Sequence, residues 1–279
     1  MTKPVLFIKF FILFSFSSGA AQDARTLAEE MFAASRQIKT LSYIMNKEER
    51  INGKMVKQKS FIKVRRYPFQ VYAKQLNPNE GLEVLYKQGD RTALINPSGF
   101  PWFNVRLEPT SPRMTRDQHH TILDSGFDCF LDILESLFKK YDSELERMAK
   151  VAGNEIVSGR DCWILEFNNP NFSFVRYTPD ENISIQDLVK EKKISREMIQ
   201  RNNAGLDSSS KLKAGESLTI PNDYCPRMIL SVDKTTKTPM KIKVYDPQGL
   251  YQHYEFSQVQ IDPQFATNEF EPSYVEYDF

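Results

Sequence analysis

Regular alternation of apolar and polar side chains restricts the fold of this chain more than any other feature. Leu41, Tyr43 and Met45 alternate with polar neighbours, and the same period of two returns between residues 55 and 107 and after residue 226. Asn52-Gly53 can supply the positive φ angles of a tight hairpin turn. Since a period of two places apolar side chains on one face, we expect an antiparallel meander with one apolar and one solvated face.

Two stretches have a helical period instead. Residues 23–37 place Leu27 and Met31 on one stripe, and residues 127–150 carry a much heavier stripe that runs from Phe127 to Tyr141. A helix with such an apolar face must be covered, and the inner face of the sheet is the obvious partner. We therefore expect an α+β protein in which helices pack on one face of an antiparallel sheet.

Composition excludes several classes of protein. The 279 residues include 41% hydrophobic and 26% charged side chains, which is unlike a disordered or a polytopic membrane protein. A net charge of +1 provides no excess of cations for displacing the counterions of nucleic acid. We expect a globular protein with no nucleic-acid partner.

The first 21 residues have the pattern of a secretory signal. Lys3 precedes an apolar stretch from Val5 to Phe16, which only Lys9 interrupts, and small residues follow up to Ala21. The stretch is short for a membrane span, which takes about 20 apolar residues. We expect cleavage after residue 21 and a mature chain in the bacterial envelope, with an uncleaved anchor as the alternative.

Export permits disulfides, so the three cysteines need an interpretation. Cys129 lies in the apolar helical stretch and is expected in the core. Cys162 and Cys225 flank the segment described next, which makes a bond between them conceivable. Free buried thiols are the alternative that the sequence favours.

Aromatic residues stop abruptly in the second half of the chain. The 46 residues between Tyr177 and Tyr224 contain no Phe, Trp or Tyr, although 12% of the chain is aromatic. Their aliphatic residues predict the order strand, helix, helix, strand, with Ser195 as the N-cap of the second helix. We expect an inserted unit at 177–223 with its own aliphatic core, which splits a larger domain into residues 22–176 and 224–279.

The inserted run YTPDENISIQDLVKEKKISREMIQRNNAGLDSSSKLKAGESLTIP resembles a LysM domain, the peptidoglycan- and chitin-binding module. This resemblance implies a βααβ fold with a glycan groove between the loop after the first strand and the loop after the second helix. One departure is the first loop, where the family usually has Gly-Asp-Thr-Leu. The implied glycan-binding residues are Asp180, Glu181, Asn182, Ile183, Asn203, Ala204, Gly205 and Leu206.

The rest of the chain resembles a bacterial family of unknown function related to the periplasmic lipoprotein-carrier (LolA-like) fold. The elements LSYIMNKEERINGK, FIKVRRYPFQVYAKQLNP, GLEVLYKQG and SVDKTTKTPMKIKVYDPQGLYQHYEF carry this resemblance. It implies a curved antiparallel half-barrel with helices packed on its concave face, in which some relatives hold acyl chains.

Residues suited to catalysis or metal binding are few. His119-His120 is the one adjacent histidine pair, and we interpret it as a hydrogen-bonded loop pair, because adjacent side chains diverge and no second cluster of His, Cys or Asp stands at ligand spacing. His253 is expected to be exposed on a strand. No Gly-x-Ser-x-Gly elbow and no thiol near a histidine is indicated. The sequence predicts no catalytic residue, no metal ligand and no cofactor.

Two hypotheses about function follow from these resemblances. In the first, the insert binds N-acetylglucosamine-containing peptidoglycan without hydrolysing it, or is a degenerate module that serves as a spacer or a protein contact. In the second, the half-barrel carries a lipid or the acyl chains of a lipoprotein, although a closed, dry core explains its apolar content equally well.

Overall fold

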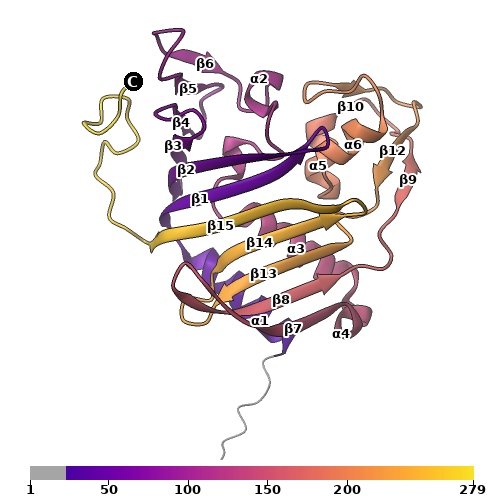
Figure 1. The fold of residues 1–279 in the computed structure, drawn as a ribbon. Helices are drawn as coiled ribbons and strands as arrows, with labels where there is room; N and C mark the ends of the chain where they lie inside the picture. The colour runs from indigo at the N-terminus through magenta and orange to yellow at the C-terminus, as the bar shows by residue number, and fades with distance from the viewer. Residues whose placement is uncertain (1–22) are drawn as a thin grey trace, which may run out of the picture.

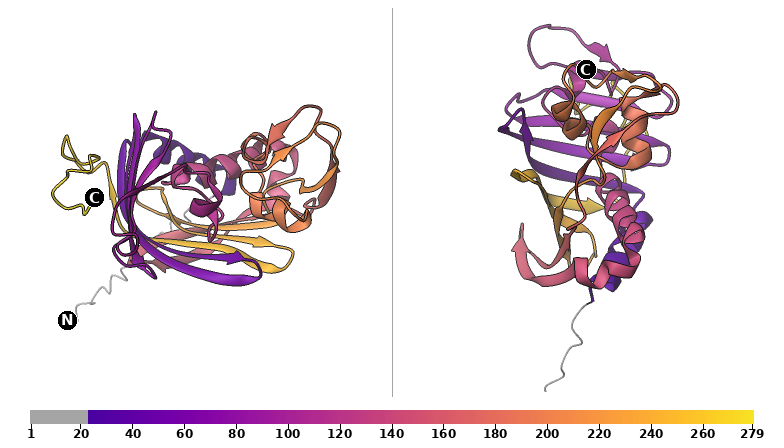
Figure 2. Two further views of the ribbon diagram at one scale, coloured as in Figure 1. Left: turned by 90° about the horizontal axis from the view of Figure 1, so that it is seen from above. Right: turned by 90° about the vertical axis from the view of Figure 1, so that its right-hand side faces the viewer.

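The computed structural model describes residues 23–279, so the predicted secretory signal lies outside the described residues. One large antiparallel sheet curves around the longer helices, and a smaller helical unit rises from one end (Figures 1 and 2). The predicted α+β half-barrel is therefore confirmed. Across the sheet the strands run in the order β6-β5-β4-β3-β2-β1-β15-β14-β13-β8-β7. Their bounds are β1 Thr40–Ile51, β2 Lys54–Arg66, β3 Phe69–Asn77, β4 Glu83–Lys87, β5 Ala93–Asn96, β6 Val105–Leu107, β7 Ala149–Val157, β8 Arg160–Asn168, β13 Arg227–Asp233, β14 Pro239–Asp246 and β15 Gly249–Ile261.

The two halves of the sheet join through two long strands, β1 and β15. β1 pairs with β15 from Leu41 opposite Ile261 onward, so the first and the last strand in sequence meet in the middle of the sheet. β1 also pairs with β2 through the predicted hairpin, in which Asn52 and Gly53 have φ angles of 48° and 79°. The long central ladder makes the half-barrel one continuous unit.

The main core lies between the concave face and two helices. Helix α1 (Ala24–Gln37) begins at Asp23, whose carboxylate accepts the N–H of Thr26 at 3.0 Å. Helix α3 (Asp128–Lys140) lies beside it (Figure 2). The apolar side chains of both helices belong to the same buried core as those of the sheet. The fully buried residues at this contact include Leu27, Met31, Leu134, Leu165 and Leu230.

The predicted helix at 127–150 was too long. α3 ends at Lys140, a 3-10 turn η2 (Asp142–Glu144) and a short helix α4 (Leu145–Met148) follow, and strand β7 starts at Ala149. Leu145 and Met148 continue the helical spacing because they pack into the core from α4. Strand β7 was not predicted, because it is an edge strand whose side chains are mostly exposed or half-buried and therefore show no clear alternation of apolar and polar residues.

The strand predicted from Trp102 to Leu107 is shorter in the structure. Only Val105–Leu107 pair with β5 as β6. Phe100, Trp102 and Phe103 precede β6 in an exposed loop, where their side chains make too little contact with the sheet to extend the ladder.

We call residues 177–223 the lobe, and residues 23–176 with 224–279 the half-barrel. The lobe contains α5 (Ile185–Lys192) and α6 (Arg196–Asn202), a pair of short strands β10 (Ile183–Ser184) and β11 (Lys211–Leu212), and strand β12 (Leu218–Pro221). β12 pairs antiparallel with β9 (Phe174–Tyr177), which leads into the lobe. Its aliphatic cluster consists of Ile185, Leu188, Ile194, Ile199, Leu212, Leu218 and Ile220.

Helix α6 also attaches the lobe to the half-barrel. Met198 is fully buried and belongs to the main core, whereas its neighbour Ile199 belongs to the cluster of the lobe. At the start of α6, the Ser195 hydroxyl lies 2.5 Å from the Tyr251 hydroxyl, and at its end Arg201 forms a 2.9 Å ion pair with Asp246. The lobe has its own core but is docked along one helix.

All three cysteines have free thiols. Cys162 in β8 stands opposite Asp233, the last residue of β13, while Cys225 lies before Arg227, the first residue of β13. The six residue steps between those ends span about 20 Å at about 3.3 Å each. A disulfide needs Cα atoms within about 7 Å, so the conceivable Cys162–Cys225 bond is not formed.

Candidate functional site

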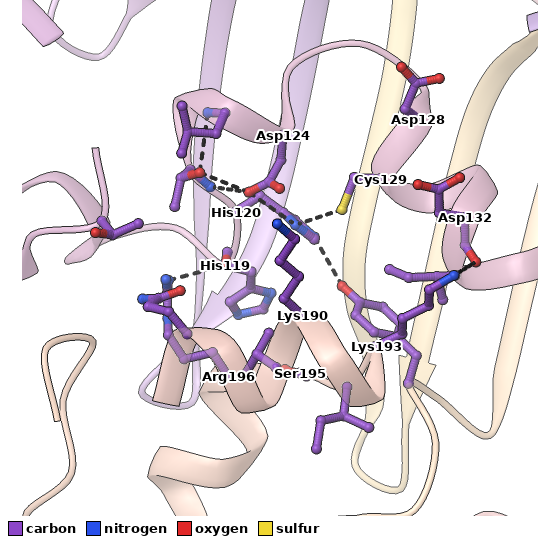
Figure 3. Close-up of a pocket in the computed structure, with 18 of the residues that line it drawn as sticks. His119, His120, Asp124, Asp128, Cys129, Asp132, Lys190, Lys193, Ser195 and Arg196 are labelled. Atoms are coloured by element: carbon purple, nitrogen blue, oxygen red, sulfur yellow. Dashed lines mark hydrogen bonds and ion pairs between the residues drawn. The ribbon is translucent and has the colours of Figure 1, made fainter. Parts of the chain in front are cut away.

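A cavity of about 610 Å³ lies where the lobe meets the half-barrel (Figure 3). Its walls are the loop that leads into α3, the first half of α3, and α5 with the turn between α5 and α6. Apolar side chains come from both parts of the molecule and include Phe69, Leu123, Ile133, Val189 and Ile194.

Charges of opposite sign face each other across this cavity. Asp124, Asp128 and Asp132 line the half-barrel side, and Figure 3 shows Lys190, Lys193 and Arg196 on the side of the lobe. Lys193 bridges the two, since its Nζ donates to the main-chain oxygen of Asp132 at 3.1 Å. The cavity therefore has an apolar lining with an acidic wall and a basic wall.

The wall that carries the histidine pair is shaped by a capping box. The turn η1 (Ile122–Asp124) begins at Thr121, whose hydroxyl accepts the N–H of Leu123 at 3.2 Å. In return, Asp124 accepts the N–H of Thr121 at 2.7 Å. These two hydrogen bonds satisfy main-chain N–H groups that would otherwise have no acceptor at the start of the turn. They also fix the position of the Asp124 carboxylate, one turn after His120.

His119 is held as a neutral imidazole inside the protein. Its Nε2 donates to the main-chain oxygen of Arg50 at 3.2 Å, and its Nδ1 accepts the amide of Gln252 at 2.7 Å. Burial lowers the pKa of His119 to about 4. The imidazole stacks on Tyr251, with 4.3 Å between ring centroids.

Glu49 of β1 holds the loop that carries His119 and His120. Its carboxylate is fully buried, accepts the main-chain N–H of His119 at 3.1 Å and accepts the hydroxyl of Tyr254. Burial opposes the charged form, but the ammonium of Lys47, 3.4 Å away, acts together with the two imidazoles and the Tyr254 hydroxyl to outweigh it, which lowers the pKa of Glu49 to about 2. Glu49 is thus a charged acceptor that positions the histidine loop.

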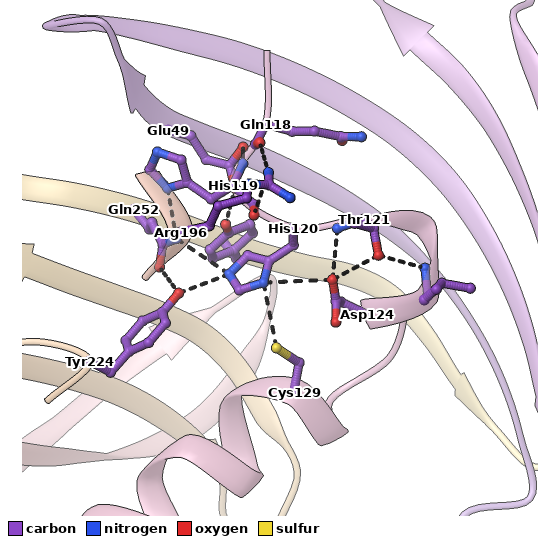
Figure 4. Close-up of polar contacts among 12 residues, drawn as sticks. Glu49, Gln118, His119, His120, Thr121, Asp124, Cys129, Arg196, Tyr224 and Gln252 are labelled. Atoms are coloured by element: carbon purple, nitrogen blue, oxygen red, sulfur yellow. Dashed lines mark hydrogen bonds and ion pairs between the residues drawn. The ribbon is translucent and has the colours of Figure 1, made fainter. Parts of the chain in front are cut away.

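His120 faces the cavity and makes contacts through both ring nitrogens (Figure 4). Its Nε2 lies 2.9 Å from the Tyr224 hydroxyl, and its Nδ1 lies 3.5 Å from the sulfur of Cys129 and 4.0 Å from a carboxylate oxygen of Asp124. Burial lowers the pKa of His120, so the ring is neutral near pH 7.

Cys129 stands in the first turn of α3, beside His120. Burial, followed by the charge of Asp124 and of Asp132, raises the pKa of this thiol well above its ordinary value. A protonated thiol is a poor nucleophile, so the pair lacks the thiolate on which cysteine catalysis depends.

Arg196 is the buried cation of the cavity. Its guanidinium donates to the main-chain oxygens of Gln118 and His119 at 3.0 and 3.1 Å, and burial lowers its pKa. Among residues 23–279, no carboxylate lies within 4 Å of Arg196 in an ion pair. The charges of Asp124 and Glu49 act on the guanidinium from further away, and an anion in the cavity would give it a direct partner.

The eight residues implied as a glycan site lie on the lobe, away from this cavity. Asp180, Glu181, Asn182, Ala204 and Gly205 are exposed, and Ile183, Asn203 and Leu206 are half-buried. The two loops border one core, because Ile183 and Leu206 both pack against the aliphatic cluster of the lobe.

Two of these eight side chains are already engaged inside the lobe. The Asn203 amide donates to the main-chain oxygens of Ile199 and Thr219 and accepts the N–H of Thr219, all at 2.7–2.8 Å. Asn182 accepts the N–H of Ala214 at 3.0 Å. Both amides tie loops together, so a sugar would have to be recognised by the main chain of these loops and by the other six residues.

Sequence reasoning missed the cluster around His120. It found no metal-ligand spacing and no thiol near a histidine, whereas the structure places ligand atoms of His120, Asp124 and Cys129 within 4.8 Å of one another. His253 was expected to be exposed but is half-buried, because Lys243 and Glu48 stand opposite it on the neighbouring strands. The four-residue spacing of His120 and Asp124 was the one signal of a shared site in the sequence. Cys129 follows Asp124 by five residues, so the three residues together do not form a regular ligand spacing.

Fold and cavity together define an antiparallel half-barrel whose concave side is filled by helices and whose cavity is completed by an inserted lobe. Residues 38–188 match the family described as "Protein of unknown function (DUF1571)", and because this range is more than half of the chain, the chain belongs to that family. The matched range ends inside α5, so it includes the start of the lobe. A search among curated proteins gives no match.

Several solved structures are similar at low identity. The complex of Pseudomonas aeruginosa MucA/MucB is 14% identical with a TM-score of 0.41, covering 89% of this chain and 60% of the matched chain. Lipoprotein LppX from Mycobacterium tuberculosis is 8% identical with a TM-score of 0.41, covering 87% and 97%. A putative outer membrane lipoprotein-sorting protein domain from Vibrio parahaemolyticus is 10% identical with a TM-score of 0.36, covering 89% and 96%.

This chain spans about three fifths of the MucB-type chains it matches. Likeness at this level does not identify a ligand. Within residues 23–279, no helix is both long enough and apolar enough to cross a membrane.

Proposed function

We propose that this protein is a non-enzymatic binding protein of the bacterial envelope that shelters the acyl chain of a lipid or lipoprotein. The observation that carries the proposal is the cavity of about 610 Å³ between the half-barrel and the lobe. Its volume falls within the range of about 300–1,000 Å³ that is typical of small-molecule sites. Location in the envelope rests on the secretory signal predicted at residues 1–21.

The apolar wall suits a hydrocarbon chain. Phe69, Ile133 and Val189 come from β3, α3 and α5, so a chain between them would contact three separate elements. Each buried methylene contributes about 0.8 kcal/mol, so about eight of them would contribute roughly 6 kcal/mol before the cost of ordering the ligand is subtracted. Contacts of the headgroup, described next, would add to this apolar contribution.

The basic wall suits an anionic headgroup. Arg196 is buried without a carboxylate partner among the described residues, and Lys190 is exposed at the same wall. A phosphate or carboxylate there would form charge-assisted hydrogen bonds with the guanidinium. The headgroup would have to lie on the side of the lobe, because Asp124, Asp128 and Asp132 on the opposite side repel an anion. The preferred ligand is therefore an anionic amphiphile bound in that one orientation.

Binding of a fluorescent fatty acid to the chain from residue 23 onward tests this proposal. Val189→Trp fills the cavity, and Val175→Trp is the matched control, because Val175 is a partly exposed residue of β9 outside the cavity. We expect saturable binding by the unmodified chain and by the control, and at least tenfold weaker binding by Val189→Trp. Absence of saturable binding by the unmodified chain, or equal affinity in both variants, would refute the proposal.

A second candidate function is the binding of peptidoglycan by the lobe. The observation that favours it is the order strand, helix, helix, strand, with β9 and β12 paired antiparallel. The division into a LysM-like unit at 177–223 between 22–176 and 224–279 belongs to this proposal. Exposed loop residues Ala204 and Gly205 would then border the glycan.

Point variants test this second candidate better than removal of the lobe, because removal would expose the main core around Met198. Ala204→Trp blocks the implied groove, and Lys211→Trp places the same bulk elsewhere on the lobe. Co-sedimentation with insoluble peptidoglycan should fall at least fivefold for Ala204→Trp only. Equal sedimentation of both variants would leave the lobe without a glycan role.

A further inference from the structure

Three different ligand atoms converge on one point of the cavity wall (Figure 4). Nδ1 of His120, a carboxylate oxygen of Asp124 and the sulfur of Cys129 all lie within 4.8 Å of one another. The distance from Nδ1 to the sulfur is 3.5 Å, and the distance from Nδ1 to the carboxylate is 4.0 Å. In a tetrahedral zinc site with Zn–S of about 2.3 Å and Zn–N of about 2.0 Å, neighbouring ligand atoms are about 3.5 Å apart. The Nδ1–sulfur distance matches that spacing and the Nδ1–carboxylate distance is about half an ångström longer, so a metal would draw the Asp124 carboxylate slightly inward.

Hydrogen bonds around His120 leave the lone pair of Nδ1 on the side of the cluster. The Tyr224 hydroxyl donates to the side-chain oxygen of Gln252 at 3.0 Å, so its own oxygen accepts a proton from elsewhere. Nε2 of His120 lies 2.9 Å from this oxygen and 3.3 Å from the amide nitrogen of Gln252. Because that amide already donates to Nδ1 of His119 at 2.7 Å, we assign the shorter contact as the hydrogen bond, with Nε2 as the donor to Tyr224. With the proton on Nε2, Nδ1 is unprotonated and faces Cys129 and Asp124.

Hydrogen bonds from neighbouring residues orient the side chains of His120 and Asp124, as second-sphere residues do in metal sites. Thr121 donates its main-chain N–H and its hydroxyl to Oδ2 of Asp124 at 2.7 and 3.0 Å, and this is the oxygen that lies 4.0 Å from Nδ1 of His120. Tyr224 fixes the ring of His120 from its far side. Hydrogen bonds to ligating histidines and carboxylates are the usual means of orienting metal ligands.

We propose that His120, Asp124 and Cys129 form a zinc site with three protein ligands and a fourth position open to the cavity. A set of one imidazole, one carboxylate and one thiolate favours Zn²⁺, whereas Mg²⁺ and Ca²⁺ select oxygen ligands. All three residues line the cavity, so the fourth ligand is a water molecule or an anionic group of the cavity's occupant. On binding, the metal displaces the thiol proton to solvent, and no redox change is involved.

This inference goes beyond the proposed function and does not depend on it, because it concerns the metal alone. The untagged chain from residue 23 onward, stripped of metal by a chelator and of lipid by solvent, is titrated with Co²⁺ as a spectroscopic probe and with Zn²⁺ in competition. We expect one cobalt ion per chain, the ultraviolet charge-transfer absorption of a cobalt–thiolate bond, and displacement by one equivalent of Zn²⁺.

Variants assign the site. Cys129→Ser should abolish the charge-transfer absorption, and His120→Ala should weaken Zn²⁺ binding at least tenfold. The matched control is Cys162→Ser, which removes a buried thiol in β8 and should leave both measurements unchanged.

Three results would overturn the proposal. They are no stoichiometric metal binding by the unmodified chain, a cobalt spectrum without thiolate charge transfer, and equal zinc affinity in the Cys129→Ser and Cys162→Ser variants. The first two are measured on the unmodified chain, so they decide the matter even where a variant fails to fold. Failure of fatty-acid binding would leave this result untouched, and the two proposals therefore fail separately.

Discussion

Replacing Met198 by alanine tests whether the lobe and the half-barrel unfold as one unit. Met198 lies in a helix of the lobe, yet its side chain is fully buried in the main core. The substitution removes three heavy atoms, which is a transfer loss of about 2 kcal/mol at about 0.8 kcal/mol each, and the cavity left behind raises the expected loss to about 3 kcal/mol. For a chain of this size that corresponds to a decrease in Tm of roughly 6–12 °C.

Tryptophan fluorescence can follow this unfolding in the half-barrel alone, because residues 178–223 contain no aromatic ring. Trp163 packs against the main core, while Trp102 is exposed and contributes a constant background. We expect Met198→Ala to shift the urea transition of Trp163 by the full 3 kcal/mol, and the adjacent Ile199→Ala to shift the same transition by about 2–5 kcal/mol. A Trp163 transition within about 0.5 kcal/mol of the unmodified protein in Met198→Ala would refute the shared core.

Three further predictions concern groups inside the half-barrel. The pKa of Glu49 in the folded protein, about 2, lies below its ordinary value of 4.5, so the charged carboxylate stabilises the fold above pH 4.5. This contribution to the free energy of unfolding, about 3 kcal/mol, is lost as the pH falls toward 2. In metal-free protein, Glu49→Gln should therefore flatten the acid side of the curve of stability against pH, and an unchanged curve would contradict the assignment. The Asp233 carboxylate accepts the N–H groups of Thr235 and Thr236 at 2.8 and 2.7 Å. Asp233→Ala should therefore lower the free energy of unfolding in urea by about 1–2 kcal/mol, and Asp233→Asn should lower it by less. Equal losses in the two variants would argue against these hydrogen bonds. Denatured without reductant, the chain should expose three reactive thiols, and a count of one would mean that a disulfide forms.

Much of the half-barrel was predictable because its signals are local. Alternation marked the long strands, and Asn52-Gly53 fixed the turn between β1 and β2, as the structure confirms. The edge strand β7 was missed because few of its side chains are buried, so a period of two barely registers. The end of α3 at Lys140 was missed because Leu145 and Met148 keep a helical spacing beyond it.

The cavity could not be predicted, because it depends on how the lobe docks. Lys193 contacts Asp132 across 61 residues of sequence, and Arg196 contacts Gln118 across 78. No local pattern encodes such contacts. The cluster of His120, Asp124 and Cys129 spans a loop, a 3-10 turn and the start of a helix, so no single period relates its members.

Native mass spectrometry of the protein purified from envelope fractions without delipidation tests the central claim most directly. If a lipid occupies the cavity between the half-barrel and the lobe, the spectrum should contain a second mass that exceeds the mass of the bare chain by one lipid. Solvent extraction should remove this second mass, and Val189→Trp should lack it. A single mass equal to that of the bare chain, together with a melting temperature unchanged by solvent extraction, would contradict lipid carriage.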